Sequence, residues 1–343
     1  MKKIYIKTTE SCNLCCDHCY IGEARKNSSF FDEKASIAWL KDYMNINGLK
    51  NNDLYISFHG GEPFLCPIEK MEKVCQAFSG AQFDATTNLT YNLTDDILKF
   101  MKNYFRSESR FFIKTSWDKD IRFKTREKEL LWRENIRRLK SEGAYIKTNV
   151  CLTTKLLEMP PDNFLSCFSD SRIDELHFER LTMNTTQDIT LIPDPKIVDR
   201  WLLNLYKLSP EIEIDNFTDI KRALKGEYVG CRKRTCMKDV LTINADGSVG
   251  ACPNSSLTAP FTSIYERVQP IYEKQQELIK REELRQLSCY TCNYFSICNG
   301  DCCQLSFFHG ECPFPKNLAK SIKNRQKLQC DVVFAEKRLY HSK

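Results

Sequence analysis

The stretch Cys12-Asn13-Leu14-Cys15-Cys16-Asp17-His18-Cys19 decides how the whole chain is interpreted. It follows a short β-like run at residues 4–7 and places Cys12, Cys16 and Cys19 at a CxxxCxxC spacing. Three thiolates this close can ligate three irons of a [4Fe–4S] cluster, which leaves the fourth iron open to a substrate or cofactor. The spacing therefore predicts an iron–sulfur centre with an open coordination position.

A structural zinc site is the alternative for the same stretch, and it would need a fourth ligand at finger spacing. His18 is squeezed between two cysteines and is a poor candidate for that ligand. Cys15, directly before Cys16, is the obvious ambiguity, and we leave it out of the predicted ligand set.

The chain has 343 residues and 18 cysteines, and this combination indicates metal-binding thiols. Small secreted disulfide scaffolds reach comparable cysteine fractions, but they are far shorter. No apolar signal-peptide core follows the two N-terminal lysines, and no apolar run approaches the roughly 18 residues of a membrane span. We therefore expect a cytoplasmic protein with reduced thiols and no membrane partner. The net charge of +6 is modest and gives no argument for a nucleic-acid partner.

Short β-like runs alternate with helical patterns over the first half of the chain, as they do in βα units. Six strands in this order predict a parallel sheet, either doubly wound or a curved, incomplete barrel, with its chemistry at the carboxyl ends of the strands. The predicted strands cover residues 4–7, 54–58, 82–86, 111–116, 145–152 and 176–178. The predicted helices cover residues 32–48, 68–78, 94–102 and 126–140.

The character of the sequence changes after a stretch at 194–224 that is predicted to be helical and connecting. Ten of the 18 cysteines lie between Cys231 and Cys330. Short β runs surround the dipeptide Asp246-Gly247, which is a hairpin signal. We therefore predict a second, cysteine-rich domain that begins near residue 229.

Three further motifs each follow one of the predicted strands. They are His59-Gly60-Gly61-Glu62-Pro63, Thr87-Asn88 and Ser116-Trp117-Asp118. Each motif alone could be a turn or a cap. Their occurrence in this order after CxxxCxxC resembles the radical S-adenosylmethionine (SAM) superfamily, and the resemblance covers most of residues 1–190.

The resemblance implies which residues bind SAM. The backbone of the glycine pair and the Glu62 carboxylate would bind the amino group of its methionine moiety. Lys119 stands where the family has a glycine after its S-x-D element, so this loop differs. An arginine that pairs with the SAM carboxylate would be Arg122 or Arg126, and Arg126 is the one we predict. The predicted SAM-binding residues are Gly60, Gly61, Glu62, Asn88, Ser116 and Arg126.

The same resemblance implies the fold and the activity. Residues 1–190 would form a partial (β/α)6 TIM-like barrel, and residues 191–228 a helical connector. The enzyme would cleave SAM reductively, with electrons from a flavodoxin- or ferredoxin-type donor. The resulting 5′-deoxyadenosyl radical would abstract a hydrogen atom from a substrate carbon.

The second cysteine array, at 229–335, resembles the SPASM domain of radical SAM enzymes, a small α+β unit that binds two auxiliary [4Fe–4S] clusters. Zinc ribbons, which also pair CxxC motifs, are a minor alternative. Cys303 and Cys312 lie near enough to replace an assigned ligand. In the grouping that the family implies, the first auxiliary cluster takes Cys231, Cys236, Cys252 and Cys302. The second takes Cys289, Cys292, Cys298 and Cys330.

Most proteins with this architecture modify ribosomally synthesised peptides, so the expected substrate is a precursor peptide or protein that is crosslinked or oxidised. Sulfatase-type maturation is disfavoured, because Pro253 stands where those maturases have an Asp base. The first predicted strand starts at residue 4 and leaves no room for an N-terminal leader-peptide-binding module, so the barrel, the second domain or a separate leader-peptide-binding protein would have to hold the peptide. The alternatives are modification of a nucleotide, nucleic acid or small metabolite, and a non-enzymatic redox sensor.

The sequence identifies no general base. Around the cavity we suspect several polar or aromatic residues, for each of which a surface ion pair or an ordinary polar contact is a comparable explanation. These residues are Tyr20, His59, Asp118, Glu179 and Arg180.

Overall fold

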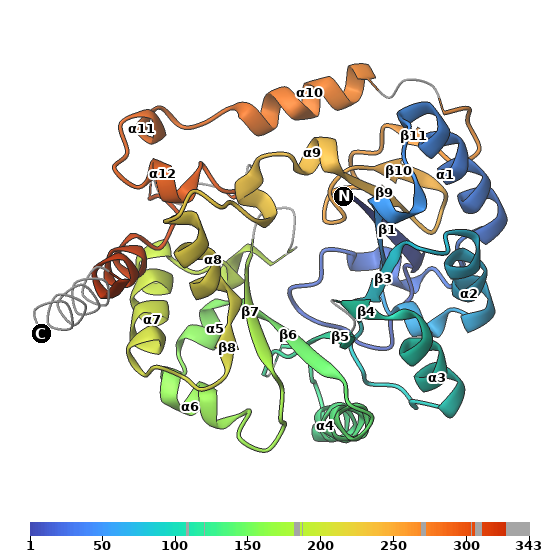
Figure 1. Cartoon of the computed structure of the whole chain (residues 1–343). Coiled ribbons are helices and arrows are strands. Elements are labelled where there is room, and N and C mark those ends of the chain that lie inside the picture. Colours follow the sequence, from blue (N-terminus) through green and yellow to red (C-terminus); the bar gives the residue numbers. More distant parts are fainter. Residues whose placement is uncertain are drawn as a thin grey trace, which may run out of the picture.

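Parallel strands form the open, curved sheet at the centre of the fold (Figure 1). The computed structural model describes residues 1–107, 110–119, 121–181, 186, 188–268, 272–302, 304–305 and 311–326. The barrel strands are β1 Lys2–Thr9, β2 Leu54–Gly60, β3 Gln82–Ala85, β5 Arg110–Ser116, β6 Tyr145–Leu152 and β7 Glu175–Arg180. β1–β3 pair in one sheet and β5–β7 in another, and a parallel bridge between Thr86 and Lys114 joins the two. The predicted α/β class with an incomplete (β/α)6 barrel is confirmed.

Helices cover the outer face of this sheet (Figure 1). The first begins where predicted, because the Asp32 side chain accepts a 3.0 Å hydrogen bond from Ala35 N, and it ends at Gly48 in the left-handed conformation. The α-helices of this half are α1 Glu33–Asn47, α2 Ile68–Ala77, α3 Asp95–Tyr104, α4 Arg126–Ser141, α5 Thr154–Leu157, α6 Pro161–Ser166, α7 Pro195–Lys207 and α8 Asp215–Ala223. Short 3₁₀ helices are η1 Gly22–Lys26, η2 Asn51–Asp53, η3 Pro63–Leu65, η4 Ile189–Leu191 and η5 Gly230–Lys233.

The two faces of the barrel strands differ in chemistry because successive side chains point to opposite sides. On β1, Ile4 and Ile6 are buried in the hydrophobic core under the helices. The alternate residues of β1, Lys3, Tyr5 and Lys7, face the interior of the barrel together with charged residues of β5, β6 and β7. The barrel interior is therefore polar, unlike a barrel whose interior is filled with branched apolar side chains.

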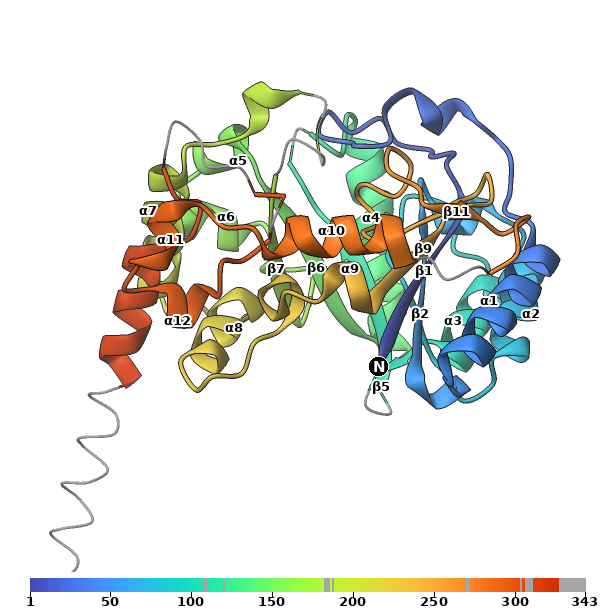
Figure 2. The same cartoon turned by 90° about the horizontal axis from the view of Figure 1, so that it is seen from above.

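The cysteine-rich part continues the barrel sheet at the edge formed by β1. Strand β9, Val240–Ile243, pairs in parallel with β1, and β10, Ser248–Gly250, returns antiparallel through the predicted turn at Gly247. Helices α9 and α10 lie side by side (Figure 2). The other elements are β4 Arg106–Ser107, β8 Glu213–Ile214, β11 Thr262–Ser263, α9 Cys236–Asp239, α10 Tyr272–Glu283, α11 Leu287–Tyr290 and α12 Phe295–Cys298. None of the described helices combines the length and apolar character needed to cross a bilayer.

Candidate functional site

The CxxxCxxC loop leaves the carboxyl end of β1 and gathers the predicted thiols. Cys19 N donates a 3.2 Å hydrogen bond to Cys16 O, and Leu14 N donates one of 3.4 Å to Cys12 Sγ. Burial raises the pKa of the Cys12 thiol to about 12, and the neighbouring Cys16 and Cys19 thiols add to this shift. A bound metal centre would reverse it, because coordination to a cation deprotonates a thiol. Cys15, which we left out of the ligand set, is exposed.

The Gly60-Gly61 loop packs directly on the backbone that leaves β1. Gly61 N donates to Thr9 O at 2.9 Å, and Gly60 has a φ of +136°. A Cβ on Gly61 would lie 2.1 Å from Ser11 O, a contact that no side chain tolerates. The two glycines are therefore required for the close approach of this loop to the cysteine loop.

Glu62 joins this loop to the loop after β3. Its fully buried carboxylate accepts hydrogen bonds of 2.7 Å from Thr87 Oγ1 and from Asn88 N. Burial raises the pKa of Glu62 to about 7, although these hydrogen bonds oppose the shift. Asn88 Nδ2 in turn donates to Asn13 Oδ1 at 2.7 Å and lies 3.6 Å from Cys12 Sγ. The cysteine loop and the motifs that follow β2 and β3 thus form one connected polar network.

Ser116, the last residue of β5, is buried, and Asp118 follows it. Asp118 accepts a 2.6 Å hydrogen bond from Cys151 N of β6 and lies 3.7 Å from His18 Nε2. The ligand atoms of His18, Asp118 and Cys151 fall within 4.8 Å of one another. A cation has little reason to bind there, because the guanidinium of Arg122 already neutralises Asp118 at 2.9 Å.

Arg122 is the arginine that the fold brings to the cysteine loop. Its Nη2 lies 3.4 Å from His18 Nε2, and its charge lowers the pKa of Cys16, which burial raises. Arg126, the residue that we predicted, is exposed at the start of α4. The geometry therefore favours Arg122 over Arg126 as the arginine beside the cysteine loop.

Several buried polar atoms near this loop have no hydrogen-bond partner within the described ranges. They belong to side chains on β1, β2 and the cysteine loop, and such orphaned groups indicate space for a polar ligand. Burial lowers the pKa of His59 to about 4. The atoms are Lys7 Nζ, Glu10 Oε1 and Oε2, Tyr20 Oη and His59 Nδ1.

The four cysteines of the predicted first auxiliary set lie together. Cys231 makes side-chain hydrogen bonds with Cys236 and Cys302, and these bonds hold the pKa of its thiol above the usual value. Burial raises the pKa of Cys252 to about 11, with further contributions from Cys236 and Cys302. Four thiols from separate segments therefore converge, which is the donor set that a fully coordinated cluster requires.

Three thiols of the second predicted set, those of Cys289, Cys292 and Cys298, interact with the thiol of Cys312. The negative charges of Cys289 and Cys292 act on the Cys312 thiol, whose pKa burial raises. Cys312 also acts on the thiol of Cys298. Cys330, the predicted fourth ligand, lies outside the described residues, as does Cys303.

Asp301 ties the cysteine-rich part to the barrel, and sequence reasoning missed it. Its buried carboxylate lies 2.7 Å from Arg180 Nη2 at the end of β7 and 3.7 Å from Arg232 Nε. Asn299, Gly300 and Asp301 all have positive φ, which is rare for consecutive residues. The signal available in the sequence was an acid between two cysteines, which by itself names no partner.

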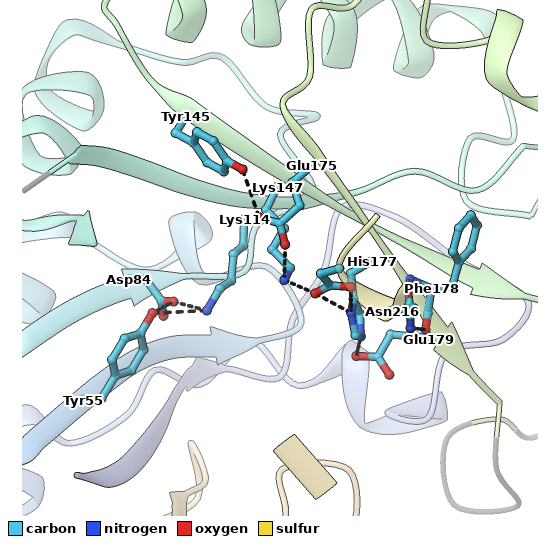
Figure 3. Close-up of polar contacts among 11 residues, drawn as sticks. Tyr55, Asp84, Lys114, Tyr145, Lys147, Glu175, His177, Phe178, Glu179 and Asn216 are labelled. Atoms are coloured by element: carbon cyan, nitrogen blue, oxygen red, sulfur yellow. Dashed lines mark hydrogen bonds and ion pairs between the residues drawn. The ribbon is translucent and has the colours of Figure 1, made fainter. Parts of the chain in front are cut away.

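Two groups of hydrogen-bonded charged and polar side chains occupy the barrel interior (Figure 3). In the sequence, each of these residues resembles an ordinary surface residue. The available signal was the placement of charged residues at alternate positions of a strand, which indicates that one face of the strand is polar. Glu179 was suspected; the other members were not. One group contains Tyr55, Asp84 and Lys114. The other, larger group contains Tyr145, Lys147, Glu175, His177, Glu179 and Asp215.

A surface cavity of about 460 Å³ lies at the amino ends of β5 and β6. Arg110, Tyr145 and Asp174 contribute to its lining. None of the predicted site residues lines it, so we do not place the site there.

Comparisons with known proteins give a fold and no close relative. No protein-family model and no curated protein matches the chain. The structure of native anSMEcpe with bound AdoMet (SAM) and Cp18Cys peptide superimposes with a TM-score of 0.74 at 19% identity, covering 96% of this chain and 98% of that chain. The structure of Streptococcus suis SuiB bound to precursor peptide SuiA gives a TM-score of 0.59 at 16% identity, covering 88% of this chain and 71% of that chain. This chain therefore has the fold of both structures.

Proposed function

We propose that this chain, which shares its fold with a structure that contains AdoMet, is a radical SAM enzyme and binds SAM at a [4Fe–4S] cluster held by Cys12, Cys16 and Cys19. The observation that carries the proposal is the network through Glu62, which links the cysteine loop, the glycine pair and Asn88. When bound, the reduced cluster and SAM supply a 5′-deoxyadenosyl radical that removes a hydrogen atom from a substrate carbon.

The chain's own residues bind and orient the cofactor. The backbone of Gly60 and Gly61 lies against the cysteine loop and offers its polar groups to the SAM amino group, with Ser116 and Asn88 at the flanking strand ends. Arg122 replaces Arg126 in our assignment as the cation for the SAM carboxylate, since it lies beside the cysteine loop.

The donor sets of the cysteine-rich part support two further clusters, so we propose three [4Fe–4S] clusters in total. The proposed ligands of the first auxiliary cluster are Cys231, Cys236, Cys252 and Cys302. For the second, we propose Cys312 in place of Cys330, because its thiol interacts with those of the other three ligands. We retain 1–190, 191–228 and 229–335 as proposed core, connector and SPASM regions.

The proposed substrate is a precursor peptide, which the enzyme would crosslink or oxidise. Two solved structures with this fold contain peptides, Cp18Cys and SuiA. Pro253 follows Cys252 and supplies no acid–base group, so formylglycine formation is not our proposal. A flavodoxin- or ferredoxin-type donor and a separate leader-peptide-binding protein remain proposed partners, and the cytoplasm the proposed location.

Anaerobic reconstitution with iron and sulfide, followed by reaction with SAM and dithionite, tests the proposal. We expect about twelve irons per chain and 5′-deoxyadenosine by mass spectrometry. Cys12→Ala should lose about four irons and all cleavage, whereas Cys15→Ala, the matched control, should retain both. A wild-type chain that produces no more 5′-deoxyadenosine than Cys12→Ala is not a radical SAM enzyme. Co-expression with each small open reading frame found near the gene then tests the substrate by mass change of the encoded peptide.

A further inference from the structure

A chain of alternating charges runs along the interior of the barrel (Figure 3). Lys147 Nζ lies 2.7 Å from Glu175 Oε1 and also contacts the Asp215 carboxylate. Asp215 Oδ1 lies 2.7 Å from His177 Nδ1, and His177 Nε2 lies 3.2 Å from Glu179 Oε1. The imidazole is thus held between two carboxylates, and the chain ends at Glu179.

The local sequence explains why these groups meet. Glu175, His177 and Glu179 occupy alternate positions of β7 and share its interior face. The start of α8 is fixed to the same strand, because Asn216 accepts a 2.7 Å hydrogen bond from Phe178 N and donates one of 3.0 Å to Phe178 O. Asp215 is thereby held beside the His177 ring.

Glu179 differs from the other carboxylates of the network in its exposure. Its side chain is 56% exposed, against 14% for Glu175 and 16% for Asp215. Its only ion-pair partner among the described residues is His177, which binds one carboxylate oxygen. The second oxygen is therefore available to a ligand.

Glu179 also lies near the carboxyl end of β7, at the same edge of the barrel as the cysteine loop that leaves the carboxyl end of β1. Its charge raises the pKa of Cys252, for which burial is the main cause, and that of Cys151. Cys252 belongs to the first auxiliary set, and Cys151 contacts Asp118 beside the CxxxCxxC loop. A substrate held at this edge of the barrel would meet this carboxylate.

We propose that Glu179 is the catalytic base of the reaction, with His177 and Asp215 as its positioning residues; this rests on the proposed function. In forming a crosslink, the substrate loses a C–H and an X–H bond, where X is sulfur, nitrogen or oxygen, and gains a C–X bond. The hydrogen atom goes to the 5′-deoxyadenosyl carbon, the proton to Glu179, and one electron to an oxidised iron–sulfur cluster as acceptor. Atoms and charge then balance.

The electrostatics fit this role. Burial alone would lower the pKa of His177, but Glu179 and Asp215 raise it to about 10, so the imidazolium persists at neutral pH. Partial removal from water raises the pKa of Glu179, but the charge and hydrogen bond of His177, together with the charge of Arg180, lower it overall, so the carboxylate stays ionised. An ionised carboxylate is a weak base, but it suffices to remove the proton of the X–H group, because this proton becomes strongly acidic as X bonds to carbon. The charged groups around His177 are Lys147, Glu179, Arg180, Asp215 and Asp219.

The test compares Glu179→Gln with Glu213→Gln. The second variant is the matched control, because Glu213 is an exposed glutamate on β8. The reconstituted proteins are assayed with SAM, dithionite and a synthetic peptide, chosen from small open reading frames near the gene because the reconstituted wild type changes its mass. Glu179→Gln should keep 5′-deoxyadenosine formation within about threefold but lose about 100-fold in crosslinked peptide. Glu179→Asp should restore part of the product, and Asp215→Asn should shift its pH profile.

A second arm uses the reconstituted protein, with its clusters in the oxidised state, and nitrogen-15 NMR of the histidine rings. His177 should remain protonated well above pH 7 in the wild type and should titrate lower in Asp215→Asn and Glu179→Gln. Product at the wild-type rate from Glu179→Gln, or a wild-type His177 that titrates near 6.5, overturns the assignment. Absence of 5′-deoxyadenosine from the wild type would instead refute the proposed function, while the NMR arm still tests Glu179.

Discussion

The carboxylate of Glu62 accepts a 2.7 Å hydrogen bond from the backbone N–H of Asn88, and this bond joins the loops that follow β2 and β3. Asn88 continues the connection to Cys12, so a residue remote from the cysteines in sequence helps to hold their loop. An ionised carboxylate suits this position because it only accepts hydrogen bonds.

Replacing Glu62 with Gln should therefore destabilise the protein by about 1–3 kcal/mol, because an amide NH₂ would face an N–H or O–H donor in a buried site. Urea unfolding of the cluster-free protein measures this change. Glu69→Gln is the matched control, since Glu69 is an exposed residue of α2 and its replacement should cost less than about 0.5 kcal/mol. Equal effects of the two substitutions would contradict the role given to Glu62.

Gly61→Ala should destabilise the protein more than Gly226→Ala does. The new Cβ at position 61 would lie 2.1 Å from Ser11 O and 2.5 Å from Glu10 O. Both obstacles are backbone atoms, so relief requires the cysteine loop to move. We expect a loss of about 3 kcal/mol or more and weaker SAM binding. Gly226→Ala, at a φ of +82° with open space around it, should cost only about 1 kcal/mol. A smaller loss for Gly61→Ala than for Gly226→Ala would refute the clash argument.

The fourth ligand of the second auxiliary set can be decided by iron content. Cys312→Ala should remove about four of about twelve irons from the reconstituted protein, and Cys330→Ala should leave the content unchanged. The expectation follows from the interaction of the Cys312 thiol with Cys289, Cys292 and Cys298. Iron analysis and EPR of the reduced variants report the result, and the reverse pattern would restore Cys330 as the ligand.

Local signals made much of the barrel predictable. Asp32 and Gly48 mark both ends of α1, and the hydrophobic pattern placed β6 at its observed bounds, Tyr145–Leu152. The parallel pairing of β9 with β1 was not predictable, since no local pattern names a partner strand that is distant in the sequence. The two-residue strands β4 and β8 were also missed, because so short a run carries no period.

In the candidate site too, the sequence identified some residues and only the fold identified others. Motif order identified the loops that carry Cys12, Gly61 and Asn88, because these residues recur at fixed places after strands. Arg122 could be separated from Arg126 only by the fold, which turns one toward His18 and leaves the other exposed.

The pH dependence of stability should distinguish the two histidines of the barrel interior. For His177 the folded pKa, about 10, lies above the unfolded value near 6.5, so its contribution is complete below pH 6.5 and is lost as pH rises toward 10. For His59 the folded pKa, about 4, lies below the unfolded value, so stability falls as pH drops from 6.5 toward 4.

Urea unfolding at a series of pH values gives the free energy of unfolding as a function of pH. We expect His177→Gln to change the slope of this curve only above pH 6.5, and His59→Gln to change it only below pH 6.5. Each slope is at most about 1.4 kcal/mol per pH unit. The two variants control for each other, because they differ in the sign of the pKa shift and share the chemistry of the replacement. A His177→Gln protein that keeps the wild-type slope between pH 6.5 and 10 would mean that His177 is not held as an imidazolium between Asp215 and Glu179.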